Sequence, residues 1–181
     1  MFKKIFDIIT TVLVAAVVVL AILLGGVRLI GFTPYTILSP SMSPKYLPGD
    51  LVYVKKTDPE KIEAGDVLTF VANDELTVVT HRVAEVDRES RCFYTKGDAN
   101  DTRDASPVLY ENALGTVRFS IPKLGFLANY LSGTRGKYVA VAVLCVLALI
   151  FVIPDLFKPK KNDSVKESEK TEIKDPSEED K

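Results

Sequence analysis

The feature that most constrains this chain is a run of twenty residues without a charge, from Ile8 to Val27. About 20 apolar residues suffice for a helix to cross roughly 30 Å of hydrocarbon. A cleaved signal peptide, the alternative, has a shorter apolar core of about 7–15 residues followed by a site with small residues. We therefore predict that residues 1–30 hold a short cytoplasmic stub and a retained transmembrane signal anchor, which argues against a simple soluble enzyme.

A second uncharged run covers the sixteen residues from Tyr138 to Ile153. It is short for a span, but its residues are apolar on every face of a helix, which leaves no polar side for water. Phe126, Tyr130 and Tyr138 are aromatic residues of the kind that sit at a headgroup interface. We expect residues 134–157 to form a C-terminal transmembrane helix. A buried core helix or a re-entrant segment is the alternative.

Basic residues next to the two runs predict the orientation, because cytoplasmic flanks carry an excess of Lys and Arg. The flanks outside the two runs hold Lys3, Lys4, Lys158, Lys160, Lys161 and Lys166, against Arg28, Arg135 and Lys137 on the inner flanks. The prediction is a multi-pass protein of the cell membrane with both tails cytoplasmic and an extracytoplasmic middle. Residues 158–181 are rich in charge and poor in apolar side chains, which is typical of a disordered tail.

The segment between the two runs, residues 31–133, is long enough for one small core. Short β-branched and aromatic runs alternate there with turn residues such as Gly49-Asp50 and Gly65-Asp66, a pattern that favours strands. The expected strands cover residues 36–38, 51–54, 67–71, 76–86, 91–95 and 114–121. The predicted fold class is mostly β, a compact folded-sheet or barrel-like catalytic domain between two transmembrane helices.

Composition narrows the chemistry. A net charge of −1 provides no field for nucleic acid. The two cysteines, Cys92 and Cys145, make neither a disulfide framework nor a zinc site, and the single histidine excludes a multi-His metal centre.

That histidine, His81, lies in an expected strand and shares a face with Val79 and Val83. A serine hydroxyl needs a base within hydrogen-bond reach to become a nucleophile, and His81 is the one imidazole available to the serines of Ser39-Pro40-Ser41-Met42-Ser43-Pro44. Asp98, Asp101 and Asp104 supply carboxylates that would orient the ring. The spacing does not fit a calcium loop, since Thr102 and Arg103 stand where an oxygen ligand and a glycine are needed. Plain structural readings stay open: a half-buried strand histidine, a Pro/Ser-rich loop and a solvated acidic turn.

These residues resemble type I signal peptidases, in particular the archaeal and endoplasmic-reticulum-like branch that uses serine and histidine. The resemblance covers most of residues 33–121 in four blocks: Ser39–Pro44 as S-x-S-M-x-P, Gly65–Phe70, Thr80-His81-Arg82-Val83, and Lys96-Gly97-Asp98-Ala99-Asn100 as K-G-D-N-N with one alanine departure. It implies that Ser41 is the nucleophile, that His81 is the base where the bacterial branch has lysine, that Asp104 orients His81, and that Asp98 is a supporting acid.

The implied function is that of a membrane-bound serine endopeptidase removing signal peptides from secreted preproteins through an acyl-enzyme. The Ser41 backbone N–H and the Ser39 hydroxyl would stabilise the oxyanion, and extended substrate would add to a sheet edge near Ile37 and Leu38. The expected partners are preproteins, the lipid bilayer and the secretion translocon, with no nucleic acid, metal or cofactor. The alternatives are a membrane-tethered, non-catalytic β binding domain, a different serine hydrolase, or a self-cleaving relative, which would need a lysine in place of His81.

Overall fold

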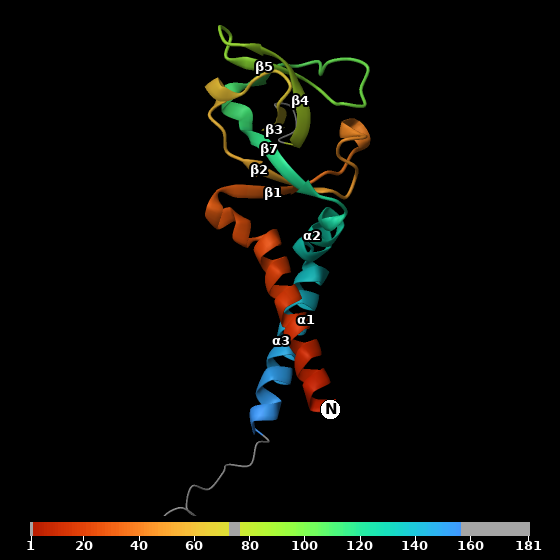
Figure 1. Cartoon of the computed structure of the whole chain (residues 1–181). Helices are drawn as coiled ribbons and strands as arrows, with labels where there is room; N and C mark the ends of the chain where they lie inside the picture. The colour runs from red at the N-terminus through yellow and green to blue at the C-terminus, as the bar shows by residue number, and fades with distance from the viewer. Residues whose placement is uncertain (1, 73–76, 157–181) are drawn as a thin grey trace, which may run out of the picture. The chain divides into compact units, whose positions relative to one another are not determined.

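The computed structural model describes residues 2–72 and 77–156. The chain divides into two compact units, residues 1–141 and 142–181. The first contains helix α1, the whole sheet, helix α2 and the start of helix α3 (Figure 1). The strands are β1 (Phe32–Thr36), β2 (Leu51–Lys55), β3 (Val67–Val71), β4 (Val78–Asp87), β5 (Cys92–Lys96), β6 (Val108–Leu109) and β7 (Ala113–Ile121). The helices are α1 (Phe2–Leu24), α2 (Leu124–Ser132) and α3 (Thr134–Leu156).

All seven strands belong to one antiparallel sheet in the order β1-β2-β7-β3-β4-β5-β6. The pairing register shifts at Tyr53/Val54, Thr69/Phe70 and Val83/Glu85, and such irregularities bend and twist a sheet. Among the described strands, β7 alone joins the β1–β2 part to the β3–β6 part. The prediction of a mostly β fold built from a folded sheet is confirmed.

The core follows from the two-residue period of strands, because neighbouring side chains point to opposite faces. Strand β2 sends Val52 and Val54 into a cluster with Ile37, Met42 and Tyr46. It sends Leu51 and Tyr53 into a second cluster with Val27, against which Leu24 and Leu124 pack. A third cluster gathers Leu68, Phe70, Val83, Phe93 and Tyr110 around the β3–β6 part. Strand β2 is therefore buried on both faces.

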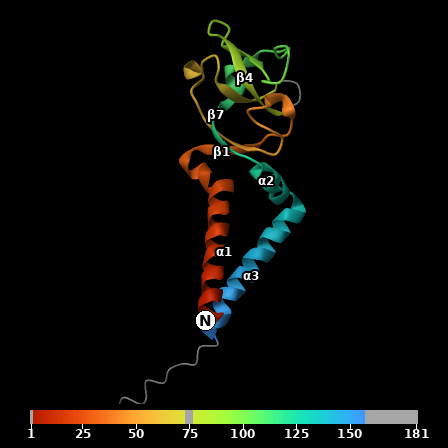
Figure 2. The ribbon, with the colours of Figure 1, turned by 45° about the vertical axis from the view of Figure 1, so that its right-hand side comes forward.

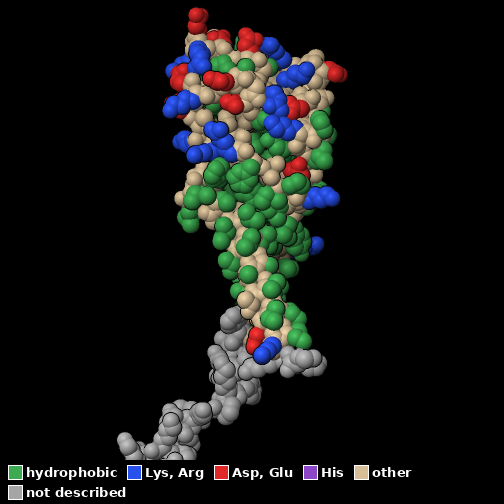
Figure 3. Space-filling view, in the orientation of Figure 1, with side chains coloured by type: hydrophobic (Ala, Val, Ile, Leu, Met, Phe, Trp, Pro, Cys, Tyr) green, Lys and Arg blue, Asp and Glu red, His purple; other side chains and the backbone are tan. Residues whose placement is uncertain are grey.

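Helix α1 ends at Leu24, just before Gly25 and Gly26, rather than at Val27 as the uncharged run suggested. Glycine favours helix ends because it loses more backbone freedom in a helix than other residues. The chain continues through the short turn η1 (Gly26–Ile30), and the Tyr53 hydroxyl donates a hydrogen bond to the Leu23 carbonyl at 3.0 Å. Within the described chain α1 is the single helix long and apolar enough to cross a membrane by itself. Its Asp7–Leu24 segment is not buried in the protein, and apolar side chains cover it (Figure 3).

Helices α2 and α3 reach the length and composition of a span as a pair bent by 97°. The sequence pattern did not predict α2, which lies in a region expected to be β. Its Leu124 and Ala128 side chains pack on the cluster that contains Leu51 and Tyr53 of β2, and α2 lies beside β1 (Figures 1 and 2). The second transmembrane helix, 134–157, remains a prediction. The predicted disordered tail, 158–181, lies outside the described residues.

Most strand predictions agree with the structure. The first was misplaced, however, because β1 covers residues 32–36, and β6 was not expected. Strand β1 contains Pro34, and it lies at the edge of the sheet, where a residue without an N–H is tolerated.

Candidate active site

Ser41 lies in a single tight turn, η2 (Pro40–Met42), between β1 and β2. The next side chain, Met42, is 1% exposed and fills the cluster beneath the turn. The Ser43 N–H donates to the Pro40 carbonyl, and the Tyr46 N–H donates to the Met42 carbonyl. Burial of Met42 therefore fixes the turn to the core and leaves the half-buried Ser41 pointing out of it.

His81 projects from β4 toward this turn. Its Nε2 lies 3.1 Å from Ser41 Oγ, and its Nδ1 lies 2.7 Å from Asp104 Oδ2. A carboxylate can only accept, so Nδ1 carries the proton and Nε2 of the neutral ring accepts from the Ser41 hydroxyl. The His81 side chain is 12% exposed, which limits competition from water for both hydrogen bonds.

Asp104 is held in place by two hydrogen bonds to Thr95 of β5. Its backbone N–H donates to the Thr95 carbonyl at 2.9 Å. The Thr95 hydroxyl, on a fully buried residue, donates to Asp104 Oδ2 at 2.6 Å. Thr95 was not identified from the sequence, since a threonine in an apolar strand carries no signal of this contact. The structure thus connects Thr95, Asp104, His81 and Ser41 in one chain of hydrogen bonds.

Asp98 points to a different partner from the one expected of a catalytic acid. Its two oxygens accept from Arg82 Nε and Nη2 at 2.8 Å and 2.6 Å, and Arg82 Nη1 donates to the Gly65 carbonyl. The hydrogen bond to Asp98 raises the pKa of the Arg82 guanidinium further above its ordinary value. Arg82 directly follows His81, so the two side chains leave β4 on opposite faces. Asp98 therefore supports the strand that carries His81.

The loop around Gly97 contacts the serine turn directly. The Ala99 N–H donates to the Ser41 carbonyl at 2.8 Å. Gly97 is buried, and a Cβ there would lie 2.7 Å from the Ser41 carbonyl oxygen. The K-G-D-A-N block thus needs a glycine because the serine backbone passes so close.

The remaining predicted residues surround Ser41. Ser39 Oγ lies 2.9 Å from Ser41 Oγ. Ile37 is buried, and its N–H and carbonyl are bonded to the carbonyl of Asp50 and the N–H of Gly49. Leu38 is 77% exposed. Leu38 lies just beyond β1, after the last residue that pairs with β2.

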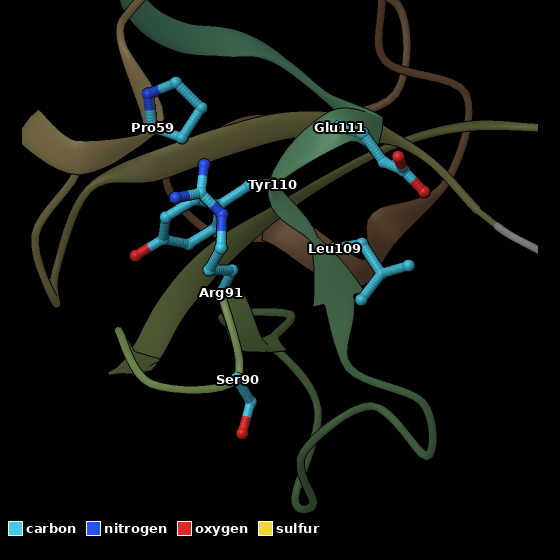
Figure 4. Close-up of a pocket in the computed structure, with 6 residues that line it drawn as sticks. All are labelled: Pro59, Ser90, Arg91, Leu109, Tyr110 and Glu111. Carbon is cyan, nitrogen blue, oxygen red and sulfur yellow. The ribbon is translucent and has the colours of Figure 1, made fainter.

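Two pockets of the sheet domain differ in their relation to these residues. One of about 310 Å³ is walled by His81, Asp104 and apolar side chains that include Phe70, Val79 and Val108. The other, of about 440 Å³, lies at β6 and the β4–β5 turn (Figure 4). It is lined by Pro59, Ser90, Arg91, Leu109, Tyr110 and Glu111, with the Arg91 guanidinium 5.2 Å from the centre of the Tyr110 ring, and it contains none of the Ser41, His81 and Asp104 side chains.

Comparison with known proteins identifies the family. Residues 8–91 match the family described as signal peptidase, peptidase S26. The chain is 30% identical over 128 residues to the signal peptidase complex catalytic subunit SEC11 of Komagataella phaffii, covering 62% of this chain and 73% of that protein. The chain belongs to the signal peptidase family. The resemblance drawn from the sequence is confirmed.

Other relatives come from distant organisms. The chain is 34% identical over 120 residues to signal peptidase I W of Bacillus subtilis, which covers 61% of this chain and 63% of the Bacillus protein, just under two thirds of its length. It is 28% identical over 127 residues to SEC11C of Rattus norvegicus, covering 63% of this chain and 65% of that protein. The family match contains Ser41 and His81 and ends before Asp98 and Asp104.

Proposed function

We propose that this signal peptidase homologue is a membrane-bound serine endopeptidase that removes signal peptides from preproteins through Ser41, His81 and Asp104. The observation that carries the proposal is the pair of distances at His81, 3.1 Å to Ser41 Oγ and 2.7 Å to Asp104 Oδ2. A nucleophile, a base and an orienting acid within hydrogen-bond reach are the recognised geometry of a serine hydrolase.

In the first half of the reaction Ser41 Oγ attacks the scissile carbonyl while its proton passes to His81 Nε2. Asp104 stabilises the imidazolium and does not itself become protonated. The tetrahedral intermediate collapses, the C–N bond breaks, and His81 returns the proton to the leaving amine. In the second half His81 takes a proton from water as the water oxygen attacks the ester carbonyl. The bond between that carbon and Ser41 Oγ then breaks, His81 returns the proton to Oγ, and the new carboxyl terminus leaves.

Ser39 has a defined place in this scheme. Because the Ser41 hydroxyl donates to His81, the Ser39 hydroxyl is the donor in the 2.9 Å contact between the two serines. When Ser41 Oγ bonds to carbon, the Ser39 hydroxyl is free to turn toward the oxyanion beside the Ser41 backbone N–H. Loss of one such donor typically costs about 10²–10³ in rate.

An extended substrate would pair with the backbone of Leu38, since the backbone groups of Ile37 already bond to the Gly49–Asp50 turn. Ile37 and Met42 would then form the apolar floor beneath the scissile residue. The opposite wall would be the part of β4 before Arg82, because β5 pairs with β4 only from Arg82 onward.

The membrane setting of the proposal rests on α1. With the stub of Lys3 and Lys4 in the cytoplasm, the sheet domain lies outside, where the preprotein is released from the translocon. We also propose that residues 134–157 return the chain to the cytoplasm. SEC11 relatives are named as subunits of a signal peptidase complex, so accessory subunits belong to the proposal as well.

The test uses full-length protein in membranes with a preprotein substrate. Ser41→Ala and His81→Ala are each expected to abolish cleavage while the protein still inserts, and Asp101→Ala, an exposed neighbour of the acids, serves as the control. Cleavage that survives Ser41→Ala would refute the proposal. If the wild-type protein binds the preprotein without cleaving it, and both variants still bind, the result would favour the non-catalytic binding domain.

A further inference from the structure

Helix α2 presents an apolar face that nothing in the described protein covers. Its nine residues, Leu-Gly-Phe-Leu-Ala-Asn-Tyr-Leu-Ser, carry no charge. Leu124, Gly125 and Ala128 face the sheet, whereas Phe126 is 61%, Leu127 38% and Tyr130 54% exposed. The exposed three recur at helical spacing, so they form one stripe.

The inner side of α2 is attached to the sheet domain by close backbone contacts. A Cβ on Gly125 would lie 2.7 Å from the carbonyl oxygens of Gly49 and Asp50, so the helix rests directly on that turn. The Phe126 ring covers Gly49, whose φ of +92° and lack of space both require glycine. The helix therefore has a fixed orientation on the domain.

Continuity of the chain indicates what covers the outer side. After Gly133 the chain bends by 97° into the apolar helix α3. Gly136 allows the bend, because a Cβ there would collide with the Tyr130 carbonyl. A helix perpendicular to a span lies in the plane of the bilayer. Amphipathic helices with aromatic residues and basic flanks bind at that level, and Lys123, Arg135 and Lys137 are exposed basic residues at the two ends of α2.

We propose that α2 is an interfacial helix whose Phe126, Leu127 and Tyr130 lie among the lipid headgroups of the outer leaflet. In this arrangement α2 and α3 are not one broken span. Instead α2 rests on the membrane and α3 crosses it, and the occupant of the apolar stripe is lipid.

The same helix is connected to the nucleophile through buried Asp50. Asp50 Oδ1 accepts from the Lys123 N–H just before α2, and Oδ2 accepts from the Leu47 N–H at the end of the serine loop. The next residue back, Tyr46, donates from its backbone to the Met42 carbonyl beside Ser41. These hydrogen bonds connect α2 to the turn that carries Ser41, so α2 fixes the height of the nucleophile above the bilayer. This consequence rests on the proposed peptidase function.

The location of α2 is testable by fluorescence because the chain contains no tryptophan. Leu127→Trp places a single probe on α2 at a site 38% exposed, and Leu109→Trp places a matched probe on β6 at a site 39% exposed. Each full-length variant is reconstituted into vesicles of phosphatidylcholine and phosphatidylglycerol containing brominated phosphatidylcholine. We expect bromine near the headgroup end of the acyl chain to quench the Leu127→Trp signal strongly and to leave the Leu109→Trp signal unchanged.

Equal quenching of the two probes would overturn the proposal. So would a blue-shifted Leu127→Trp emission without lipid quenching, since a protein partner or a second copy would then cover the stripe.

The functional arm separates this inference from the peptidase proposal. Leu127→Ser combined with Tyr130→Ser should lower cleavage of a membrane-embedded preprotein about tenfold or more, since the stripe loses two of the three apolar side chains that would lie in the membrane interface. Cleavage of a short soluble peptide should stay unchanged, as should both activities of the control Leu109→Ser. An unchanged preprotein rate in the double variant would refute the height-setting role. Absence of peptide cleavage in the wild type would instead refute the peptidase proposal and leave the quenching result intact.

Discussion

Replacement of Gly97 by alanine tests whether the serine turn depends on the loop that follows β5. The new methyl carbon would lie 2.7 Å from the Ser41 carbonyl oxygen and 2.8 Å from Asn100 Nδ2. The Asn100 side chain can rotate away, but the Ser41 carbonyl is backbone and is already hydrogen bonded to the Ala99 N–H. The strain therefore falls on the serine turn.

The expected displacement follows from these distances. Ordinary van der Waals contact begins near 3.4 Å, so the methyl group and the Ser41 oxygen must separate from 2.7 Å to at least that distance. A shift of this size moves Ser41 Oγ from its 3.1 Å contact with His81 Nε2. Misplacement by about 1 Å typically costs about 10²-fold in rate, so we expect kcat to fall about 10- to 100-fold.

Two measurements check the effect of Gly97→Ala. One is kcat for a peptide that spans a signal-peptide cleavage site, and the other is the rate at which a fluorophosphonate labels Ser41, which does not depend on substrate binding. Thermal unfolding reports whether the domain stays folded. Gly26→Ala is the control, because its nearest heavy atoms would lie 3.6 Å away. A Gly97→Ala protein with wild-type kcat and labelling rate would show that the loop does not position Ser41.

Four further substitutions address the two acids, the threonine that binds Asp104, and the buried phenol. Asp104→Asn should lower kcat by about 10⁴ with little change in Tm. Asp98→Asn should lower Tm, because its two hydrogen bonds to Arg82 are lost, and should leave the pH profile of the remaining activity unaltered. The reverse pattern would exchange the roles of the two aspartates. Thr95→Val removes the 2.6 Å hydrogen bond to Asp104 at nearly constant side-chain volume. We expect kcat/KM to report a loss of about 1.5–3 kcal/mol in transition-state stabilisation. An unchanged kcat/KM would show that the backbone of Asp104 alone holds it in place. Burial raises the pKa of the Tyr46 phenol, so the folded state holds that proton more tightly than the unfolded state, and the free energy of unfolding should fall as pH rises above about 10. Tyr46→Phe should make this fall less steep in denaturant titrations at several pH values. The same steepness in the variant and the wild type would contradict the prediction.

The sequence was informative where chemistry requires particular residues. The single histidine pointed to His81, and the resemblance of the serine box to the family selected Ser41. The structure places their reactive atoms within hydrogen-bond distance. Spacing alone did not separate the roles of Asp98 and Asp104, because Asp98 lies in the K-G-D-A-N block and Asp104 follows it closely. The two-residue period of the strand distinguishes the two acids in the structure. Arg82 projects from the face of β4 opposite to His81, and it binds Asp98 there through two hydrogen bonds.

The parts that were not predicted lack a local signal. Helix α2 has no charged residue to mark a polar face, and its stability comes from contact with the Gly49–Asp50 turn, which lies more than seventy residues earlier. Strand β6 has two residues and exists through its pairing with β5. Both are tertiary effects, which a reading of neighbouring residues does not reach.

The sheet order bears on when the protein acquires activity during its own synthesis. Ser41 belongs to the β1–β2 part and His81 to the β3–β6 part, and β7, which follows both in the chain, supplies the ladder between them. A nascent chain that has emerged only as far as Asn112 thus contains every proposed reactive group without the strand that joins the two parts into one sheet. We expect such a chain not to cleave other polypeptides that cross the membrane beside it. Peptidase activity would begin only after residues 113–121 have been synthesised.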